Sequence, residues 1–434
     1  MTVAERHEPF VTAYARLKTS APAGPAWLRD RREGAMRQFA ERGFPSTRLE
    51  DWRFTNISPI AETEFAADGP APTPAQVASH LFPEATAHVA VIAGGRFSNA
   101  LSSLDGLPQG VVVGSLAGSM GAMADALQPA LAQLAVGDHP FAWLNTGLFQ
   151  DGVLVHVPAG IVVDRPIQIH IASDAGTDPT VSHPRVLVMA GENSQVSIVE
   201  SYGGPEGQTY FTNAITEVLV GPGAIVHHVK VQRESRKAFH VAGTFARLGR
   251  GSVFASHNIS LGGGIVRNDI AAVLDGEGAE ATLNGLYLAD GDRLVDTHTV
   301  IDHAKAHCPS HELYKGVLGG KARAVFNGKI FVRQDAQKTD AKQTNKALLL
   351  SDDAQVNTKP QLEIFADDVK CTHGAAIGQL DEDALFYLRA RGIGRLAARD
   401  LLIRAFAGEV IQQVKPESIH DRLEALMLDA LPRG

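Results

Sequence analysis

Two side chains near the end of the sequence, Cys371 and His373, have the clearest potential for chemistry. They lie in the run KCTHG (370–374), and alternate residues of an extended strand project to the same face. Thiolate and imidazole are both ligands for zinc and iron, and thiolate favours iron–sulfur chemistry. The chain has 2 cysteines, so any thiol chemistry must involve Cys371 or Cys308.

The spacing of this pair is compatible with three kinds of site. The first is a buried structural cysteine beside a hydrogen-bonded histidine, which spacing alone favours because C-x-H is a short and common pattern. The second is a Cys–His catalytic pair. The third is a metal or cluster site. Two ligands fill only half of a tetrahedral shell, so a metal site would need ligands from elsewhere in the chain or from a partner.

Other histidines form weaker patterns. The run DHAKAHCPSH (302–311) places three histidines near Cys308, but the spacing fits no helical zinc motif and Pro309 breaks a helix. This run predicts a strand and a turn with hydrogen-bonded histidines. His227 and His228 are adjacent, so they face opposite sides of a strand and are interpreted as structural.

The polar run at 327–346 mixes lysine, arginine and amides with aspartate, and it is interpreted as a solvated face of the β-structure. The sequence contains no GxxxxGK[ST] loop, GxGxxG fingerprint, GxSxG elbow or HExxH helix. A formal net charge of -8 and a pI near 6.1 argue against nucleic-acid binding. The chain therefore has no nucleotide-binding or hydrolase motif of its own.

The whole-chain composition predicts a soluble cytoplasmic protein. The length of 434 residues suits two or three domains, and 44% of the residues are hydrophobic. Two cysteines cannot build a disulfide framework, which favours a reducing compartment. The charged N-terminus lacks the apolar core of a signal peptide. No stretch reaches 18 uninterrupted apolar residues, so we expect no membrane-spanning helix.

The central part of the chain, 149–375, predicts a repetitive β-structure. Apolar strand patterns at 153–157, 167–171 and 216–220 follow one another with little room for helices. Glycine-rich turns start at 221, 249 and 276, which are 28 and 27 residues apart. Such a period is typical of repeat architectures. It favours a β-helix over a sandwich or a propeller, because regularly spaced coils can stack on one another.

Two flanking regions differ from this body. In the region 1–148 we expect a helix over 27–42 ended by Gly43, a loose segment at 61–85, and two strands within 88–114. An alanine-rich helix is expected over 116–136, interrupted at Pro129.

The region 376–434 predicts a helical domain. Asp381 suits the N-cap of a first helix and Gly392 its stop. A second helix is expected over 395–414, and a third begins with a capping residue, Ser418, and runs to Leu431.

Four segments resemble the SufB/SufD family of iron–sulfur cluster assembly proteins. Three lie in the C-terminal half: KCTHGAAIGQLDEDALFYLRARGI (370–393), HCPSHELYKGVLGGKARAVFNGKIFV (307–332) and LLIRAFAGEVI (401–411). The fourth, PSTRLEDWRFTNI (45–57), resembles the SufD branch rather than the SufB branch. The small number of cysteines points the same way, because SufB paralogues carry the cysteine taken to receive sulfur.

The resemblance implies a mainly β fold, with a right-handed parallel β-helix core, an N-terminal mixed region and a C-terminal helical domain. It implies a non-catalytic scaffold that pairs with a SufB-like paralogue and docks a SufC-like ABC ATPase through its C-terminal helices. Arg404, Phe406 and Glu409 are then expected on the docking helix. Cys371 and His373 are expected to bind a nascent iron–sulfur cluster or iron, shared with the SufB-like partner.

Several points stay open at this stage. The role of Cys308 is undefined, and the oligomeric state of the isolated chain is open, with a homodimer as one alternative. The alternatives are a stand-alone Cys–His enzyme, with Cys371 as nucleophile and His373 as base, or a metal-binding β-helix protein. A carbohydrate-active β-helix is disfavoured because only 6% of the residues are aromatic.

Overall fold

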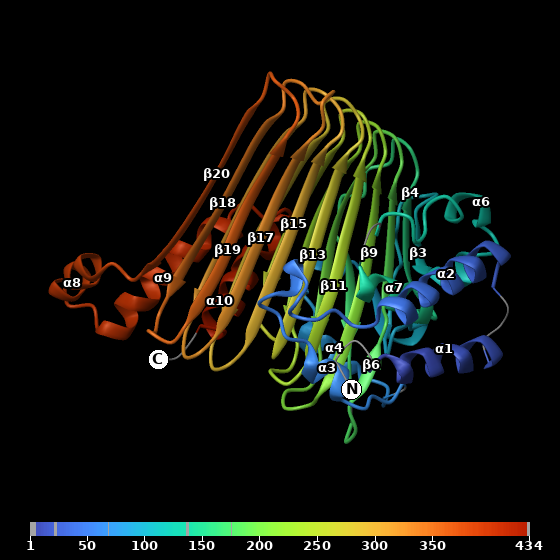
Figure 1. Cartoon of the computed structure of the whole chain (residues 1–434), viewed down its shortest axis with the longest axis horizontal. Coiled ribbons are helices and arrows are strands. Elements are labelled where there is room, and N and C mark those ends of the chain that lie inside the picture. Colours follow the sequence, from blue (N-terminus) through green and yellow to red (C-terminus); the bar gives the residue numbers. More distant parts are fainter. Residues whose placement is uncertain (1–5, 21–23, 68, 136–138, 175, 432–434) are drawn as a thin grey trace.

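The centre of the molecule is a parallel β-solenoid of about eight turns, built from two facing sheets (Figure 1). The structure is a computed structural model and describes residues 6–20, 24–67, 69–135, 139–174 and 176–431. Within these ranges each sheet has ten strands. Helices from the N-terminal part of the chain lie at one end of the solenoid, and the C-terminal helices lie toward the other end.

Successive coils contribute one strand to each sheet. Sheet I consists of β1 (His88–Ala93), β2 (Arg96–Phe97), β5 (Ile167–Ala172), β8 (Gln195–Gly203), β10 (Ile225–Arg233), β12 (Val253–Ser260), β14 (Glu280–Ala289), β16 (Pro309–Leu318), β18 (Asp340–Leu349) and β20 (Lys370–Gln379). Sheet II consists of β3 (Val112–Ser115), β4 (Gly152–Val157), β6 (Thr180–Ser182), β7 (Arg185–Ala190), β9 (Tyr210–Val220), β11 (Phe239–Leu248), β13 (Ile265–Leu274), β15 (Leu294–His303), β17 (Arg323–Val332) and β19 (Gln355–Ile364). Apart from the antiparallel pairs β1–β2 and β3–β4, the strands pair in parallel.

The glycine-rich repeat of the sequence corresponds to one coil of the solenoid. The turns at Gly221, Gly249 and Gly276 each connect a strand of sheet II to the next strand of sheet I. They stack closely: a Cβ at Gly249 would lie 2.9 Å from the backbone nitrogen of Pro222, and one at Gly276 only 2.0 Å from that of Arg250. The repeat predicted from the sequence is confirmed, and glycine is required because adjacent turns leave no space for a side chain.

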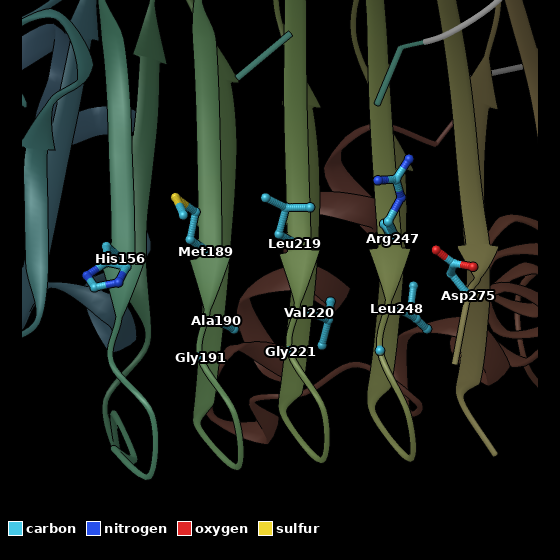
Figure 2. A pocket seen from close by; sticks show the side chains of 11 residues that line it. His156, Met189, Ala190, Gly191, Leu219, Val220, Gly221, Arg247, Leu248 and Asp275 are labelled. Carbon is cyan, nitrogen blue, oxygen red and sulfur yellow. The ribbon is translucent and has the colours of Figure 1, made fainter. Parts of the chain in front are cut away.

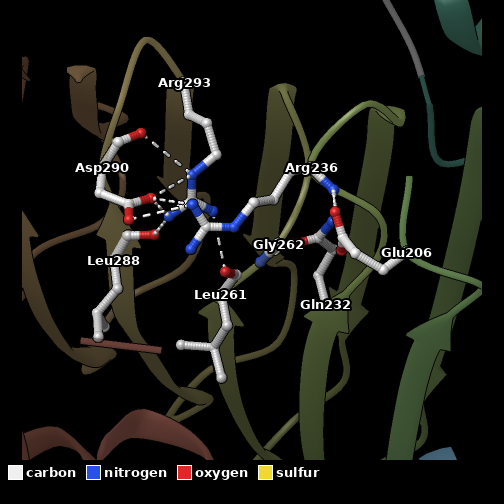
Figure 3. A network of polar contacts seen from close by, with 8 residues as sticks. All are labelled: Glu206, Gln232, Arg236, Leu261, Gly262, Leu288, Asp290 and Arg293. Carbon is white, nitrogen blue, oxygen red and sulfur yellow. Dashed lines mark hydrogen bonds and ion pairs between the residues drawn. The ribbon is translucent and has the colours of Figure 1, made fainter. Parts of the chain in front are cut away.

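Charged side chains hold the turns together on the opposite side of the coils (Figure 3). Arg293 donates to the carbonyl of Leu261 at 3.0 Å and pairs with Asp290 at 2.8 Å. Asp290 also pairs with Arg236 at 3.0 Å, and the Arg236 backbone N–H donates to Glu206 at 3.1 Å. These residues come from four successive loops, so the network connects coils that are far apart in the sequence.

The solenoid interior combines apolar packing with buried polar groups that have partners. The carboxylate of Glu200 accepts hydrogen bonds from Tyr202 at 2.5 Å and Thr216 at 2.8 Å, and lies 3.2 Å from His228 Nε2. Lys230 Nζ donates to Asn268 Oδ1 at 2.7 Å. Because buried polar groups are costly when unpaired, these contacts specify how the coils align.

The N-terminal region comprises helices and three short strands, β1, β2 and β3, that extend the sheets. Its helices are α1 (Glu8–Ser20), α2 (Ala26–Arg42), α3 (Ser58–Glu62), α4 (Pro74–His80), α5 (Leu116–Ser119), α6 (Ala124–Leu127) and α7 (Pro140–Leu148). Phe39 of α2 packs edge-on against Phe44, with ring centroids 5.2 Å apart, and Phe44 contacts Phe141 of α7. This aromatic cluster covers the outer face of sheet II at the first coils.

The predictions for this region are partly confirmed. The helix over 27–42 is present as α2, and Gly43 ends it with φ 67°. The segment 61–85, expected to be loose, contains α4, which begins with a capping box between Thr73 and Gln76. The helix expected over 116–136, with an interruption at Pro129, is present in part: the described residues hold the short helices α5 and α6, and α6 ends before Pro129. Gly118 and Gly121 lower helix propensity there, and residue 136 lies outside the described residues.

The C-terminal region consists of α8 (Glu382–Ala390), α9 (Arg395–Ile411) and α10 (His420–Asp429). Asp381 caps α8 by accepting from the backbone of Asp383 at 2.9 Å, and Gly392 follows α8 with φ 87°, as predicted. The expected cap at Ser418 was wrong: a 3-10 turn over Glu417–Ile419 precedes α10. No helix in the described part of the chain is long and apolar enough to cross a membrane. The domain limits at 148/149 and 375/376 stay a prediction.

Candidate metal centre at the open end of the solenoid

Cys371 and His373 lie on β20, the last strand of sheet I. This strand pairs in parallel with β18 on one side only. The register places Cys371 opposite Ala341 and His373 opposite Gln343. Ala341 and Gln343 are buried on the inner face of the solenoid. The two candidate ligands therefore share that inner face, as alternation predicted, at a point where no further coil covers it.

Cys371 is half-buried against the apolar side chains of the last coils. Its neighbours are Ile330, Val332, Ala341 and Ala366. Burial raises the pKa of the Cys371 thiol, and the charge of Asp340 acts in the same direction. A raised pKa keeps the sulfur protonated and weakly nucleophilic, so a metal ion or a partner's positive charge is needed to make the thiolate.

His373 is exposed and has no hydrogen-bond partner among the described residues. Within the same ranges, no group of three or more histidine, cysteine, aspartate or glutamate side chains is arranged to hold a metal ion. Cys371 and His373 thus form at most two ligands of a shell. The pair has the geometry of half a site.

Two large apolar side chains near this pair, Ile377 and Phe365, are exposed. Ile377, on the inner face of β20, is 46% exposed. Phe365, which follows β19, is 60% exposed and contacts Phe331, with ring centroids 5.4 Å apart. A cavity of about 550 Å³ lies beside Ile377 and Phe54, and most of its other lining residues are polar or charged, among them Arg53 and Lys359. Isolated exposed hydrophobic residues are common, but a group at an unpaired sheet edge is typical of an interaction surface.

The helix predicted to dock an ATPase partner, α9, packs on the outer face of sheet I. Lys315 of β16 is 3% exposed; its Nζ donates to the Phe406 carbonyl at 2.6 Å and pairs with Glu409. Arg404 pairs with Glu424 of α10. Phe406 and Glu409 therefore attach α9 to the solenoid, while Glu409 remains 52% exposed at its side chain.

The most exposed apolar side chains of the helical region are different ones. Phe386 and Tyr387 of α8 are 71% and 56% exposed, and Leu396 of α9 is 73% exposed. Sequence reasoning missed them, although FYLRARGI (386–393) and RLAARDLL (395–402) carry large apolar residues on otherwise polar helices. They form a second candidate interaction surface, on the helices rather than on the solenoid.

The histidine-rich run at 302–311 does not form a metal centre. His303 ends β15 and is buried, with Nε2 2.9 Å from Ser310 Oγ. Burial lowers the pKa of His303 to about 4, so it remains neutral. Cys308 is fully buried in the core, its Sγ 3.3 Å from the Gly276 carbonyl. The predicted strand and turn are present, and of the three histidines His303 is hydrogen-bonded as expected, whereas His307 and His311 are exposed. Cys308 packs as a core residue.

The other two polar patterns divide between the inside and the outside of the solenoid. His228 is buried and bonded to Ser256 at 3.0 Å, whereas His227 faces the opposite side, as expected. The run at 327–346 was interpreted as a solvated face, and this holds for Lys338, which pairs with Asp368. It was wrong for Gln343, which is 2% exposed inside the solenoid.

Sequence reasoning also missed the buried carboxyl group next to Gln343. Glu312 of β16 is 3% exposed, and Gln343 Nε2 donates to its Oε2 at 2.6 Å. Burial raises the pKa of Glu312 to about 7. The available signal in the sequence was a polar residue, Glu312 or Gln343, at an inward-facing position of each strand. Only the strand register shows that these two residues lie next to His373.

A further cavity, of about 330 Å³, lies on the outer face of sheet II beside the stacked turns (Figure 2). Met189, Leu219 and Arg247 come from successive strands and lie along it, with Asp275 at one end. One arginine and one carboxylate on a flat strand surface do not converge on a ligand. This groove is remote from β20 in the order of strands.

The chain matches two models of one protein family. Residues 170–406 match the SufBD core domain of the SUF system for iron–sulfur cluster assembly, and residues 7–169 match the SufBD N-terminal region. Together they cover both the solenoid and most of the N-terminal helices.

Curated relatives agree with this match. An iron–sulfur cluster assembly SufBD family protein of Synechocystis is 35% identical, with 91% of this chain and 89% of the relative covered. The iron–sulfur cluster assembly protein SufD of Escherichia coli is 30% identical, with 92% of each chain covered. The chloroplastic protein ABCI7 of Arabidopsis thaliana is 32% identical over 96% of this chain and 89% of the relative. The chain belongs to the SufB/SufD family of iron–sulfur cluster assembly proteins.

Proposed function

We propose that this chain is a non-catalytic, cytoplasmic scaffold subunit, of the SufD type, for building iron–sulfur clusters. In this proposal a SufB-like paralogue covers the open end of the solenoid, and Cys371 and His373 supply part of a transient site for iron or a nascent cluster. The supporting observation is the incomplete pair on an unpaired edge strand. An incomplete shell is expected where a partner supplies the remaining ligands.

The edge of β20 supports pairing with a second solenoid. An unpaired edge strand exposes backbone N–H and C=O groups that another strand can bind, and the apolar side chains of Ile377 and Phe365 lie beside it. The same edge would serve a second copy of this chain, which would give a homodimer of the isolated protein. Light scattering of the chain alone and with its paralogue would measure the exchange of one partner for the other.

The direct test of the metal role is His373→Ala in the complex with the SufB-like paralogue. Iron and acid-labile sulfide retained by the complex should fall while the complex stays intact. His311→Ala is the matched control, because His311 is an exposed histidine of the same sheet on the outer face. Normal iron and sulfide in an intact His373→Ala complex would defeat the ligand proposal.

The ATPase partner is proposed to dock on the C-terminal helices. Arg404, Phe406 and Glu409 were expected to take part, and the exposed Phe386 and Leu396 add apolar area on the same helices. Leu396→Asp should weaken co-purification of a SufC-like ATPase. Val300→Asp, at a 37% exposed position on the outer face of sheet II, is the control and should leave docking unchanged.

The stand-alone Cys–His enzyme remains the competing function. It needs a reactive thiolate, whereas burial raises the pKa of Cys371. Rapid alkylation of Cys371 at neutral pH in the isolated chain, faster than that of a model thiol, would favour the enzyme. Slow alkylation of Cys371, slowed further when the paralogue is bound, would favour the scaffold function.

A further inference from the structure

One row of inner-face residues leads from the buried solenoid to His373. In parallel register, Glu312 of β16 lies opposite Gln343 of β18, and Gln343 lies opposite His373 of β20. Adjacent strands are about 4.8 Å apart, so each of these side chains is within reach of the next. The row passes from a buried carboxyl through a buried amide to an exposed imidazole.

The amide of Gln343 is held on one side and free on the other. Its Nε2 donates to Glu312 Oε2 at 2.6 Å. Its Oε1 is buried and has no partner among the described residues. Because the two branches of an amide diverge, an amide whose nitrogen bonds to Glu312 directs its carbonyl oxygen away from Glu312.

The interior has space for the amide at this point. A Cβ at Gly328, on the facing strand β17, would lie 2.3 Å from Gln343 Nε2. Any larger residue at position 328 would therefore displace the amide. The absence of a side chain at Gly328 therefore leaves the space inside the solenoid that the Gln343 amide occupies.

His373 needs an acceptor of this kind if it binds a metal. A metal-bound histidine usually donates its second ring N–H to a carbonyl or carboxylate oxygen, which selects the tautomer and orients the ring. We propose that the His373 ring turns to donate a hydrogen bond to Gln343, which Glu312 anchors, and that this contact positions His373 for metal binding. In the structure the two residues are register neighbours and their side chains are not hydrogen-bonded. Gln343 is thus a positioning residue, and the assignment rests on the proposed function of His373.

The first test uses the metal-free chain and does not depend on cluster assembly. In protein labelled with ¹⁵N-histidine, the ring nitrogen shifts of His373, assigned with His373→Ala, report its tautomer in mildly alkaline buffer, where imidazoles are neutral. The native chain should show one dominant tautomer. Gln343→Met, which keeps the length of the side chain but removes the acceptor, should give a mixture.

Matched variants separate this contact from general loosening of the open end. Asn345→Leu alters the next inner position of β18, which lies opposite Ala375, and should leave the His373 signals unchanged. Gln343→Glu restores an acceptor and should restore the single tautomer. If Gln343→Met fails to fold, Glu312→Leu tests the anchor and should also give a mixture. An unchanged tautomer in Gln343→Met, or an equal change in Asn345→Leu, would overturn the proposal.

The second test measures metal affinity in the complex with the paralogue. Iron(II) binding should weaken about 10- to 100-fold in Gln343→Met, the range typical for loss of an outer-sphere partner. The two hypotheses fail separately. If the tautomer depends on Gln343 but His373→Ala retains normal iron, the metal role fails and the contact stands. If the His373→Ala complex retains less iron but the His373 tautomer does not change in Gln343→Met, the Gln343 contact is rejected and the metal role of His373 stands.

Discussion

Two histidines on the same inner row of sheet I have opposite environments. His228, in the covered part of the solenoid, is 1% exposed and contacts both Ser256 and Glu200. His373, at the open end, is exposed and without a partner in the described chain. The register connects them through a single row: His228, Ser256, Leu283, Glu312, Gln343 and His373.

The difference between the two histidines comes from their neighbours and not from their strands. Both lie on parallel strands at inward positions, and both follow the alternation of apolar and polar residues. A following coil covers His228, whereas β20 is the last strand of its sheet. The inner face of a repeat is a core wherever another coil stacks on it, and it is left uncovered where stacking ends.

The largest expected effect concerns the covered coils. Arg185 and Glu217 form a fully buried ion pair at 2.6 Å, and Arg185 also donates to Asn145 at 3.0 Å. Arg185→Met leaves the Glu217 charge buried, which should lower the free energy of unfolding by about 3–5 kcal/mol. Urea unfolding measures the loss. Lys338→Met, which removes the exposed ion pair with Asp368 at the open end, should lower the free energy of unfolding by about 0–1 kcal/mol. Similar losses in both variants would contradict the predicted difference between the covered coils and the open end.

The second prediction concerns pH and the buried carboxyl of the row. Burial raises the pKa of Glu312 from 4.5 to about 7. The folded chain therefore binds more protons than the unfolded chain between these values, and its stability falls as the pH rises through that window. As the pH rises through this window, the free energy of unfolding of the native chain should fall by on the order of 3 kcal/mol relative to that of Glu312→Gln.

Urea unfolding of both proteins at pH 5 and pH 8 provides the measurement. The buried histidines, whose pKa values are lowered, favour the opposite slope, but they are common to both proteins and cancel in the difference. A difference that does not change with pH would show that Glu312 is not proton-linked to folding.

The third prediction separates the two histidines directly. His228→Ala removes contacts at 3.0 Å and 3.2 Å inside the solenoid and should lower the free energy of unfolding by about 2–3 kcal/mol. His373→Ala should change it by less than about 0.5 kcal/mol, because the side chain is exposed. Thermal unfolding of both variants measures the contrast. A large loss of stability in His373→Ala would assign that residue to the core instead.

The smallest effect is expected beyond the open end, at the start of α8. Asp381 accepts from the backbone N–H groups of Asp383 and Ala384 at 2.9 and 3.1 Å. Asp381→Ala should cost about 1 kcal/mol of local helix stability and leave β20 unaffected. Amide hydrogen exchange resolves the two elements. Faster exchange in β20 as well would mean that the helices and the last strand unfold together.

Sequence reasoning recovered the repeat, the strand character of the core and most of the terminal helices. The turns at Gly221 and Gly249 and the caps at Asp381 and Gly392 are local devices, so they are visible without a structure. The helix expected over 116–136, interrupted at Pro129, is shorter than predicted, because its alanine content was given more weight than its glycines. Gln343 was assigned to a solvated face for a comparable reason. The polarity of the whole run 327–346 was considered, although its alternate residues face the solenoid interior and the solvent.

The sequence alone determined the periodicity of the coils, the presence of one Cys-x-His pair and the resemblance to a family. These features depend on residues close together in the chain or on recurrent spacing. Only the tertiary structure decided that β20 ends its sheet, that Cys371 is half-buried while His373 is exposed, and that Gln343 and Glu312 lie in their row. The reason is physical: burial and register in a solenoid arise from pairing between strands about 30 residues apart, which no local pattern specifies.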